Sequence, residues 1–173
     1  MTILGLLTNP DLRVDELGPP DFRSNEHFAR PHSLKLTMPE SMFVYDVRAG
    51  SLLGNKRELS IQLDPFEPVI YALSVRQAPE LVVRTPQRVA RGEIGYLGFS
   101  FNGHTSAATH ILHVEVLDPS GRVVPFYSGN LRAPFGHAVW AFPVAYNDAA
   151  GKWSVHVKDL LTGQTRSAGF EIF

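Results

Sequence analysis

Three histidines lie close together in the sequence, and their spacing decides whether they can bind a metal. A zinc or iron site needs imidazoles that converge on one point, and a strand provides this best as His-x-His, with both rings on one face. His110 and His113 are three residues apart and so face opposite sides of a strand. His104 lies in a polar turn, NGHTS. The spacing favours surface histidines, and no metal or other cofactor is predicted.

Three aspartates stand in turn sequences: Asp118 opens DPSG, Asp148 lies in NDAAG and Asp159 precedes LLTG. In such turns a carboxylate accepts hydrogen bonds from backbone N–H groups. A glycosidase instead needs two carboxyl groups about 5–10 Å apart in a cleft, and nothing in the sequence brings two together. The aspartates are predicted to shape turns, and no catalytic residue is predicted.

Aromatic rings offer another route to function, because a flat ring can stack on a sugar. Trp140 and Trp153 each alternate in phase with apolar residues of their own strand, which predicts burial for both. Four other aromatic residues of this region are candidates for the surface: Tyr96, Phe126, Tyr127 and Phe135. The segment 127–136, YSGNLRAPFG, is expected to be the longest irregular connection there. If the chain has a ligand-contact loop, it is predicted here, with contacts from Tyr127, Arg132 and Phe135.

Composition excludes several classes of protein. The 173 residues include no cysteine, which excludes disulfides, thiolate zinc sites and a cysteine nucleophile. The 16 basic and 17 acidic residues nearly cancel and form no run of like charge, so nucleic acid is not an expected partner. No apolar stretch approaches the ~20 residues of a membrane span. The start, MTILGLLTNPDLRVDE, lacks the pattern of a signal peptide, so we expect an intracellular protein or a piece of a larger one.

The elements that carry these residues are predicted to be short strands. Glycine (14) and proline (13) recur at short intervals, and the segments between them alternate with period 2, which indicates an all-β fold of antiparallel strands. Strands are expected at 34–38, 42–48, 58–63, 68–75, 80–84, 94–101, 110–118, 122–127, 137–144, 153–159 and 166–172.

Two small β-regions are expected, with a boundary at QAPE near Ala78. Residues 1–31, rich in proline, are predicted to form an extended arm, and residues 32–77 a small antiparallel domain. Residues 79–173 hold seven of the expected strands with turns at 8–12-residue spacing, which predicts an immunoglobulin-like β-sandwich without the Cys–Trp–Cys hallmark.

The stretch FVYDVRAGSLLG, residues 43–54, is interpreted as a hairpin rather than an active-site loop. Gly50 can adopt the positive φ that a tight turn needs, and a second turn is expected at Gly54. In the next strand, alternation predicts that Leu59, Ile61 and Leu63 are buried. Asp46 and Arg48 are expected to pair on the solvent face of their strand.

This hairpin and the following DPFEPVIYAL resemble, over residues 32–75, the C-terminal β-sandwich parts of large bacterial glycoside-hydrolase-like proteins. The segment 79–173, with its run YNDAAGKWSVHVKDLLTG, looks like the immunoglobulin-like or macroglobulin-like modules of exported multidomain bacterial proteins. In the glycoside-hydrolase-like proteins the sugar chemistry lies in a preceding barrel, so the resemblance implies no catalytic residue here.

The resemblance implies a non-catalytic accessory or spacer module of a larger exported carbohydrate-active protein. Its expected partners are the other domains of that polypeptide, and its expected location is extracellular or periplasmic. The alternative is a carbohydrate- or protein-binding module that acts through loop 127–136 or an exposed edge strand. A third hypothesis is an enzyme with a histidine–aspartate metal centre.

Overall fold

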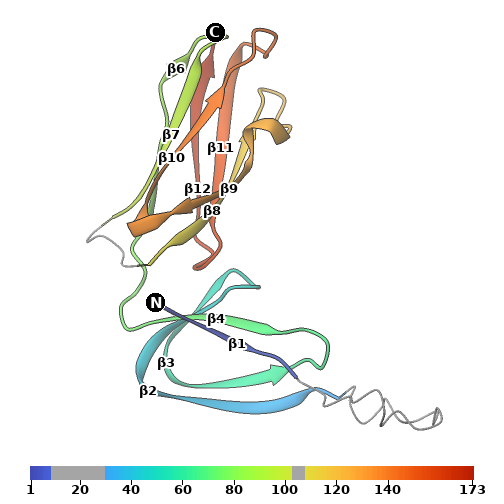
Figure 1. Ribbon diagram of the computed structural model, residues 1–173, viewed down its shortest axis with the longest axis vertical. Helices are drawn as coiled ribbons and strands as arrows, with labels where there is room; N and C mark the ends of the chain where they lie inside the picture. Colours follow the sequence, from blue (N-terminus) through green and yellow to red (C-terminus); the bar gives the residue numbers. More distant parts are fainter. Residues whose placement is uncertain (9–29, 103–107) are drawn as a thin grey trace, which may run out of the picture. The chain divides into compact units, whose positions relative to one another are not determined.

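The computed structural model describes residues 1–8, 30–102 and 108–173, and it confirms the predicted all-β class (Figure 1). Its elements are strands and two short 3₁₀-helices, and the described residues include no α-helix. The chain divides into two compact units. The first comprises Met1–Arg48 and Leu52–Arg76, and the second Ala49–Ser51 and Gln77–Phe173.

The first unit is built around a four-stranded sheet with the order β1-β4-β2-β3. Its strands are β1 (Thr2–Leu6), β2 (His32–Asp46), β3 (Ser51–Leu63) and β4 (Val69–Ser74). Strands β1 and β2 both pair antiparallel with β4. As alternation predicted, Leu59, Ile61 and Leu63 are buried, the first two in a cluster with Val44 and Tyr71.

Three expectations for the first unit are wrong. Thr2–Leu6, the first part of the predicted arm, forms β1, because its backbone pairs with β4 over five residues, and residues 9–29 of that arm lie outside the described residues. The two strands expected at 34–38 and 42–48 are one strand, β2, which continues through Pro39. The turn expected at Gly54 is absent because β3 runs unbroken from Ser51 to Leu63, although Gly54 has a φ of 104°.

The hairpin turn in the opening stretch is confirmed. Residues 47–50 form the turn between β2 and β3, and Gly50 has a φ of 63°, which costs a glycine little. Arg48 pairs with the segment before β4. Its guanidinium donates to Glu67 Oε2 and to the carbonyl oxygen of Pro68, both at 2.8 Å, and so ties the turn to the segment before β4.

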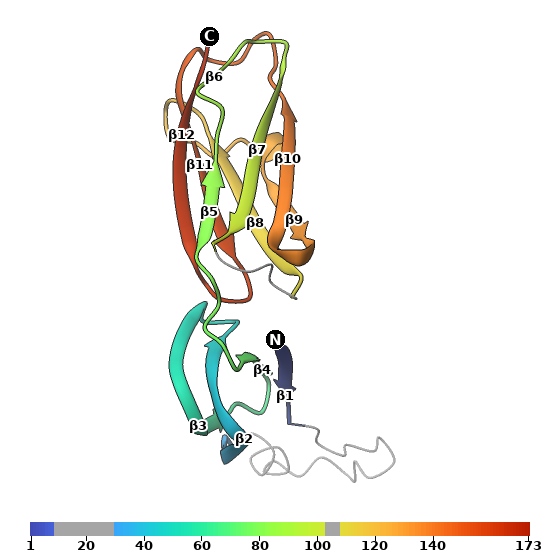
Figure 2. The ribbon, with the colours of Figure 1, turned by 90° about the vertical axis from the view of Figure 1, so that its left-hand side faces the viewer.

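The second unit is a β-sandwich with an immunoglobulin-like order of strands (Figure 2). One sheet has three strands in the order β10-β7-β5, and the other has five in the order β6-β12-β11-β8-β9. All neighbours in this unit are antiparallel except β6 and β12. The bounds are β5 Leu81–Arg84, β6 Arg88–Val89, β7 Ile94–Phe101, β8 His110–Leu117, β9 Gly129–Ala133, β10 His137–Pro143, β11 Gly151–Asp159 and β12 Thr165–Ile172.

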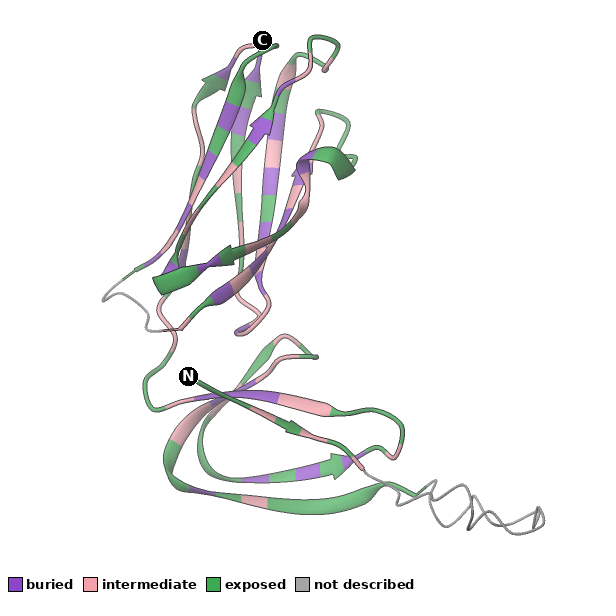
Figure 3. Cartoon of the chain, in the orientation of Figure 1, coloured by how far each residue is buried: buried purple, intermediate pink, exposed green. Residues whose placement is uncertain are grey.

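The core of the second unit is formed by buried residues of both sheets, which alternate with more exposed residues along strands such as β7 and β11 (Figure 3). Trp153 is 3% exposed and its Nε1 donates to the carbonyl oxygen of Ala149 at 2.9 Å. Trp140 is half-buried against the same core, and its Nε1 donates to the carbonyl oxygen of Tyr127 at 3.1 Å. Both predicted core assignments are therefore supported, with Trp140 less deeply buried.

Two neighbouring segments of the second unit differ from expectation. Residues 122–127 are not a strand: Val123 makes an isolated bridge to Leu117, and Pro125–Tyr127 form the 3₁₀-helix η2, which proline favours at its first position. The segment 127–136 is not an irregular loop, because it contains β9 and a second 3₁₀-helix, η3 (Pro134–Gly136). Strand β9 forms by pairing with β8. Its sequence, GNLRA, contains a glycine and has low strand propensity, so it does not predict a strand.

Candidate functional site

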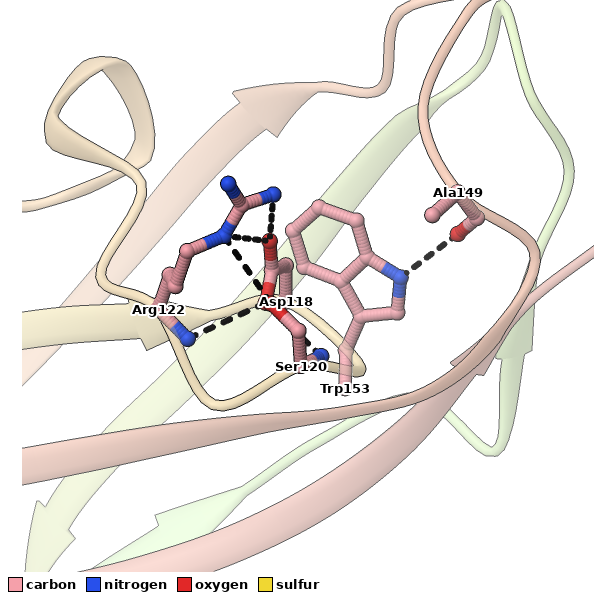
Figure 4. Close-up of polar contacts among 5 residues, drawn as sticks. All are labelled: Asp118, Ser120, Arg122, Ala149 and Trp153. Atoms are coloured by element: carbon pink, nitrogen blue, oxygen red, sulfur yellow. Dashed lines mark hydrogen bonds and ion pairs between the residues drawn. The ribbon is translucent and has the colours of Figure 1, made fainter.

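Asp118 shapes the turn after β8, as predicted (Figure 4). Its Oδ1 accepts hydrogen bonds from the backbone N–H of Ser120 at 2.8 Å and of Arg122 at 3.0 Å. The Ser120 hydroxyl also donates to Oδ1, and the Arg122 guanidinium donates to Oδ2. The hydrogen bond from the Ser120 side chain and those from the Arg122 backbone and side chain lower the pKa of Asp118 from 3.8 to about 2. The carboxylate is thus held ionised as a turn anchor.

Asp148 holds the turn after β10, again as predicted, and it also binds Tyr127. Its Oδ2 accepts from the backbone N–H of Ala145 at 2.8 Å and from the Tyr127 hydroxyl at 2.6 Å. Burial, followed by the hydrogen bond to Asp148, raises the pKa of Tyr127. Tyr127 is only 6% exposed, so the expectation of a surface aromatic there is wrong: its ring fills the core and its hydroxyl joins two loops.

Asp159 anchors the third predicted turn from a fully buried position. Its Oδ1 accepts from the backbone N–H of Leu161 at 3.3 Å, and its Oδ2 accepts from the Thr162 hydroxyl at 2.5 Å. Oδ2 also lies 2.9 Å from Nδ1 of His110, whose ring packs on Phe101 with the centroids 4.1 Å apart. This cluster is closed to solvent and belongs to the packing of the sandwich.

His110 was expected at the surface, and that expectation is wrong because it is fully buried at the start of β8. The predicted opposition of His110 and His113 is confirmed: His113 points outward, and its Nδ1 lies 2.8 Å from Oδ1 of Asn130. His104 lies outside the described residues. Among the residues that the structure describes, no three histidine, aspartate or glutamate side chains are grouped so as to hold a metal ion.

The other two predicted contact residues are exposed but lie on different elements. Arg132 is on β9, an edge strand of the five-stranded sheet, and its side chain has no partner among the described residues. Phe135 is 69% exposed in η3 and has a φ of 55°, the only positive φ among the described non-glycine residues. Tyr127 is buried, so the three predicted residues do not form one contact surface.

Three exposed apolar residues of the second unit lie together on the outward side of the three-stranded sheet, which we call the open face, while others, such as Phe126 and Tyr146, lie in connecting segments. Ile94 and Tyr96 of β7 are 54% and 58% exposed, and Val139 of β10 is 63% exposed. Because strand partners that stand opposite each other share a face, the registers place the outward residues in four rows. The rows are Val82, Ser100 and His137; Arg84, Gly98 and Val139; Tyr96 and Ala141; Ile94 and Pro143.

Two shallow hollows lie along the open face, and both include Arg84 and Gly98. One, of about 290 Å³, continues past Tyr96 and Ile94 and is also lined by the charged residues Arg88 and Glu93. The other, of about 320 Å³, reaches Ser100 and His137. Gly98 leaves room at the point they share, since a Cβ there would meet only Arg84, at 3.7 Å or more. Volumes near 300 Å³ are at the lower end for ligand sites.

The outward side of the five-stranded sheet differs in chemistry. A third hollow there, of about 390 Å³, is lined mainly by polar and charged side chains, including His113, Glu115, His156 and Lys158. A solvated sheet face normally has this composition. Contiguous exposed apolar residues are less usual and mark interaction surfaces, so the open face is the stronger candidate.

Sequence reasoning placed Tyr96 at the surface but did not find the open face. A signal was present in β7, IGYLGFSF, where Ile94 and Tyr96 alternate with the buried Leu97 and Phe99, so that both sides of the strand carry apolar side chains. A strand with one solvated side alternates apolar with polar residues. The pairing of β5, β7 and β10 that assembles the face is not visible in any one segment.

Comparison with known proteins finds matches among solved structures. No protein-family model and no curated protein matches the chain. Solved structures do match, among them the native conformation of E. coli alpha-2-macroglobulin determined by cryo-EM, at 14% identity and a TM-score of 0.47. The match covers 83% of this chain and 11% of that chain, so this chain spans a small part of the protein it matches.

Proposed function

We propose that this chain is a non-catalytic accessory or spacer β-sandwich module of a larger exported carbohydrate-active, glycoside-hydrolase-like protein. Its partners are the other domains of that polypeptide, and its location is extracellular or periplasmic. The observation that carries the proposal is the use of the conspicuous carboxylates: Asp118, Asp148 and Asp159 all bind turn backbone. The turn backbone fixes the orientation of each of these carboxylates, whereas an acid or base catalyst must be oriented toward the bound sugar.

The buried His110–Asp159 pair supports the same proposal. It has the composition of a catalytic dyad, but both side chains are fully buried, and a general base must come within hydrogen-bond reach of its substrate.

No helix among the described residues is long and apolar enough to cross a membrane.

Hydrolysis assays on the full chain test this proposal. We expect no release of nitrophenol from a panel of aryl glycosides and no shortening of soluble polysaccharides. The control is the Asp159→Ala variant, assayed in parallel. Any hydrolysis by the wild-type chain would refute the proposal, and its loss in an Asp159→Ala variant shown to be folded would assign it to the His110–Asp159 pair.

A second candidate function is a carbohydrate- or protein-binding module, and the open face favours it. The exposed Tyr96 ring, beside the small residues Gly98 and Ala141, offers a flat surface that a ligand can approach. The expected loop 127–136 fits this role less well because Tyr127 is buried. Screening on a glycan array with the wild-type chain, Tyr96→Ala and Phe135→Ala tests which surface, if either, binds sugars.

A further inference from the structure

The open face carries a cation, Arg84, that forms no ion pair with a described residue, although Glu93 lines the hollow of about 290 Å³ that Arg84 also lines. Arg84 is exposed on β5, and its side chain has no hydrogen bond or ion pair with any described residue. Four arginines elsewhere in the described chain each pair with a carboxylate: Arg48, Arg88, Arg122 and Arg166. The hollow of about 320 Å³ contains Arg84 and His137 and no acidic residue in its lining. This end of the open face therefore suits an anionic group.

A carboxylate is the group that best matches this end. The guanidinium is planar and presents parallel N–H donors that fit the two oxygens of a carboxylate. The Ser100 hydroxyl and the His137 ring lie in the neighbouring row and line the same hollow, where they add donors to a bound anion.

The outward residues beyond Arg84 on the open face are mostly apolar, and their spacing along β7 matches the side-chain spacing of an extended peptide. Successive outward residues of a strand are about 7 Å apart, and so are the side chains on one side of an extended peptide. A peptide that lies along β7 with an acidic side chain over Arg84 would place the next side chain on that side over Tyr96 and the following one over Ile94. Aliphatic surfaces such as Ile94 and Pro143 offer no hydrogen bonds to sugar hydroxyls, which favours a peptide over a glycan.

We propose that the open face docks an extended, acidic segment of a protein partner, with its carboxylate at Arg84 and apolar side chains along Tyr96 and Ile94. This inference rests on the proposed function, in which the chain is a non-catalytic module that contacts other polypeptides. Tyrosine and arginine are the residue types that most often dominate the affinity of protein interfaces.

The test uses the full 173-residue chain, biotinylated, to select from a phage library of random peptides. We expect selected peptides to share an aspartate or glutamate with an aromatic or aliphatic residue two positions away. A synthetic peptide of that sequence is then titrated against each variant by fluorescence polarisation. Raising the salt concentration should weaken binding, because the carboxylate–Arg84 contact is exposed to solvent.

Arg84→Gln is expected to weaken the peptide's affinity by about tenfold or more, the effect of losing a charge-assisted hydrogen bond. Gly98→Val fills the shared floor of the two hollows and should weaken it comparably while leaving the charge in place. Arg132→Gln is the matched control, since it removes an equally unpaired exposed arginine from the other sheet, and it should bind as the wild type does. Tryptophan fluorescence unfolding curves establish that each variant is folded.

The proposal is overturned if the selected peptides lack an acidic residue, if Arg84→Gln and Arg132→Gln bind the peptide equally, or if no peptide is enriched. It is also overturned if the open face binds a glycan instead, seen as array binding that Tyr96→Ala abolishes. These outcomes leave the accessory role standing, whereas hydrolysis of glycosides by the chain would remove that role without altering the peptide result.

Discussion

The assignment of Tyr127 to the core, rather than to a ligand-contact loop, leads to a quantitative prediction. Its ring packs near Phe142 and Trp153, with centroids 5.6 and 6.1 Å away, and its hydroxyl binds Asp148 and the backbone N–H of Ala145. Tyr127→Ala removes a buried aromatic side chain and leaves a cavity, which costs about 3–5 kcal/mol. Tyr127→Phe keeps the ring and loses only the hydroxyl.

For Tyr127→Phe we expect a loss of about 1–2 kcal/mol in the free energy of unfolding. A hydrogen bond to a charged group contributes about 1.5–3 kcal/mol, but Asp148 is half-buried and keeps the Ala145 N–H as a partner, which reduces the loss. Phe135→Ala, in contrast, changes an exposed ring and should stay within about 0.5 kcal/mol of the wild type.

Guanidinium unfolding followed by tryptophan fluorescence measures these changes in the second unit alone, since both tryptophans, Trp140 and Trp153, lie there. The midpoint should fall in the order wild type, Tyr127→Phe, Tyr127→Ala, with an unchanged slope. If Phe135→Ala destabilises as much as Tyr127→Ala, or if Tyr127→Ala costs less than about 1 kcal/mol, the reasoning on this segment is refuted.

Three further predictions concern other parts of the second unit. Gly95→Ala should destabilise it by about 1–3 kcal/mol, because a Cβ there would lie 2.4 Å from the Phe142 ring, whereas Gly98→Ala should unfold at nearly the wild-type midpoint. The pKa of Asp118 is lower in the folded state, so its stabilisation is complete above pH 3.8 and is lost as the pH falls towards 2; Asp118→Asn should flatten the stability–pH curve there. Asp159→Ala should cost about 3 kcal/mol in chemical denaturation, because it leaves buried donors without an acceptor.

Local sequence signals predicted the features that depend on one segment. The turn sequence predicts the positive φ of Gly50, and the residues next to the three aspartates predict that their carboxylates bind turn backbone. Alternation predicts the burial of Leu59, Ile61 and Leu63. Each of these features needs only a few adjacent residues and the pleat of a strand.

Features that depend on long-range pairing were missed. Strand β9 begins with a glycine and lies between two 3₁₀-helices that begin at Pro125 and Pro134, and it becomes a strand because it pairs with β8. Tyr127 appeared to be in a loop because the partners of its hydroxyl lie 18 and 21 residues further along the chain. The open face exists only once β5 and β10 flank β7, whereas the sequence pointed to loop 127–136 or to an exposed edge strand that it did not specify.

The binding surface that we propose for this module is the open face. Amide-resolved NMR of the full chain, titrated with the selected acidic peptide, tests it most directly. We predict chemical-shift changes concentrated at residues 82–84, 94–100 and 137–143, which form the open face. Changes concentrated instead on β8 and β11 of the five-stranded sheet, or in the segment 127–136, would contradict it.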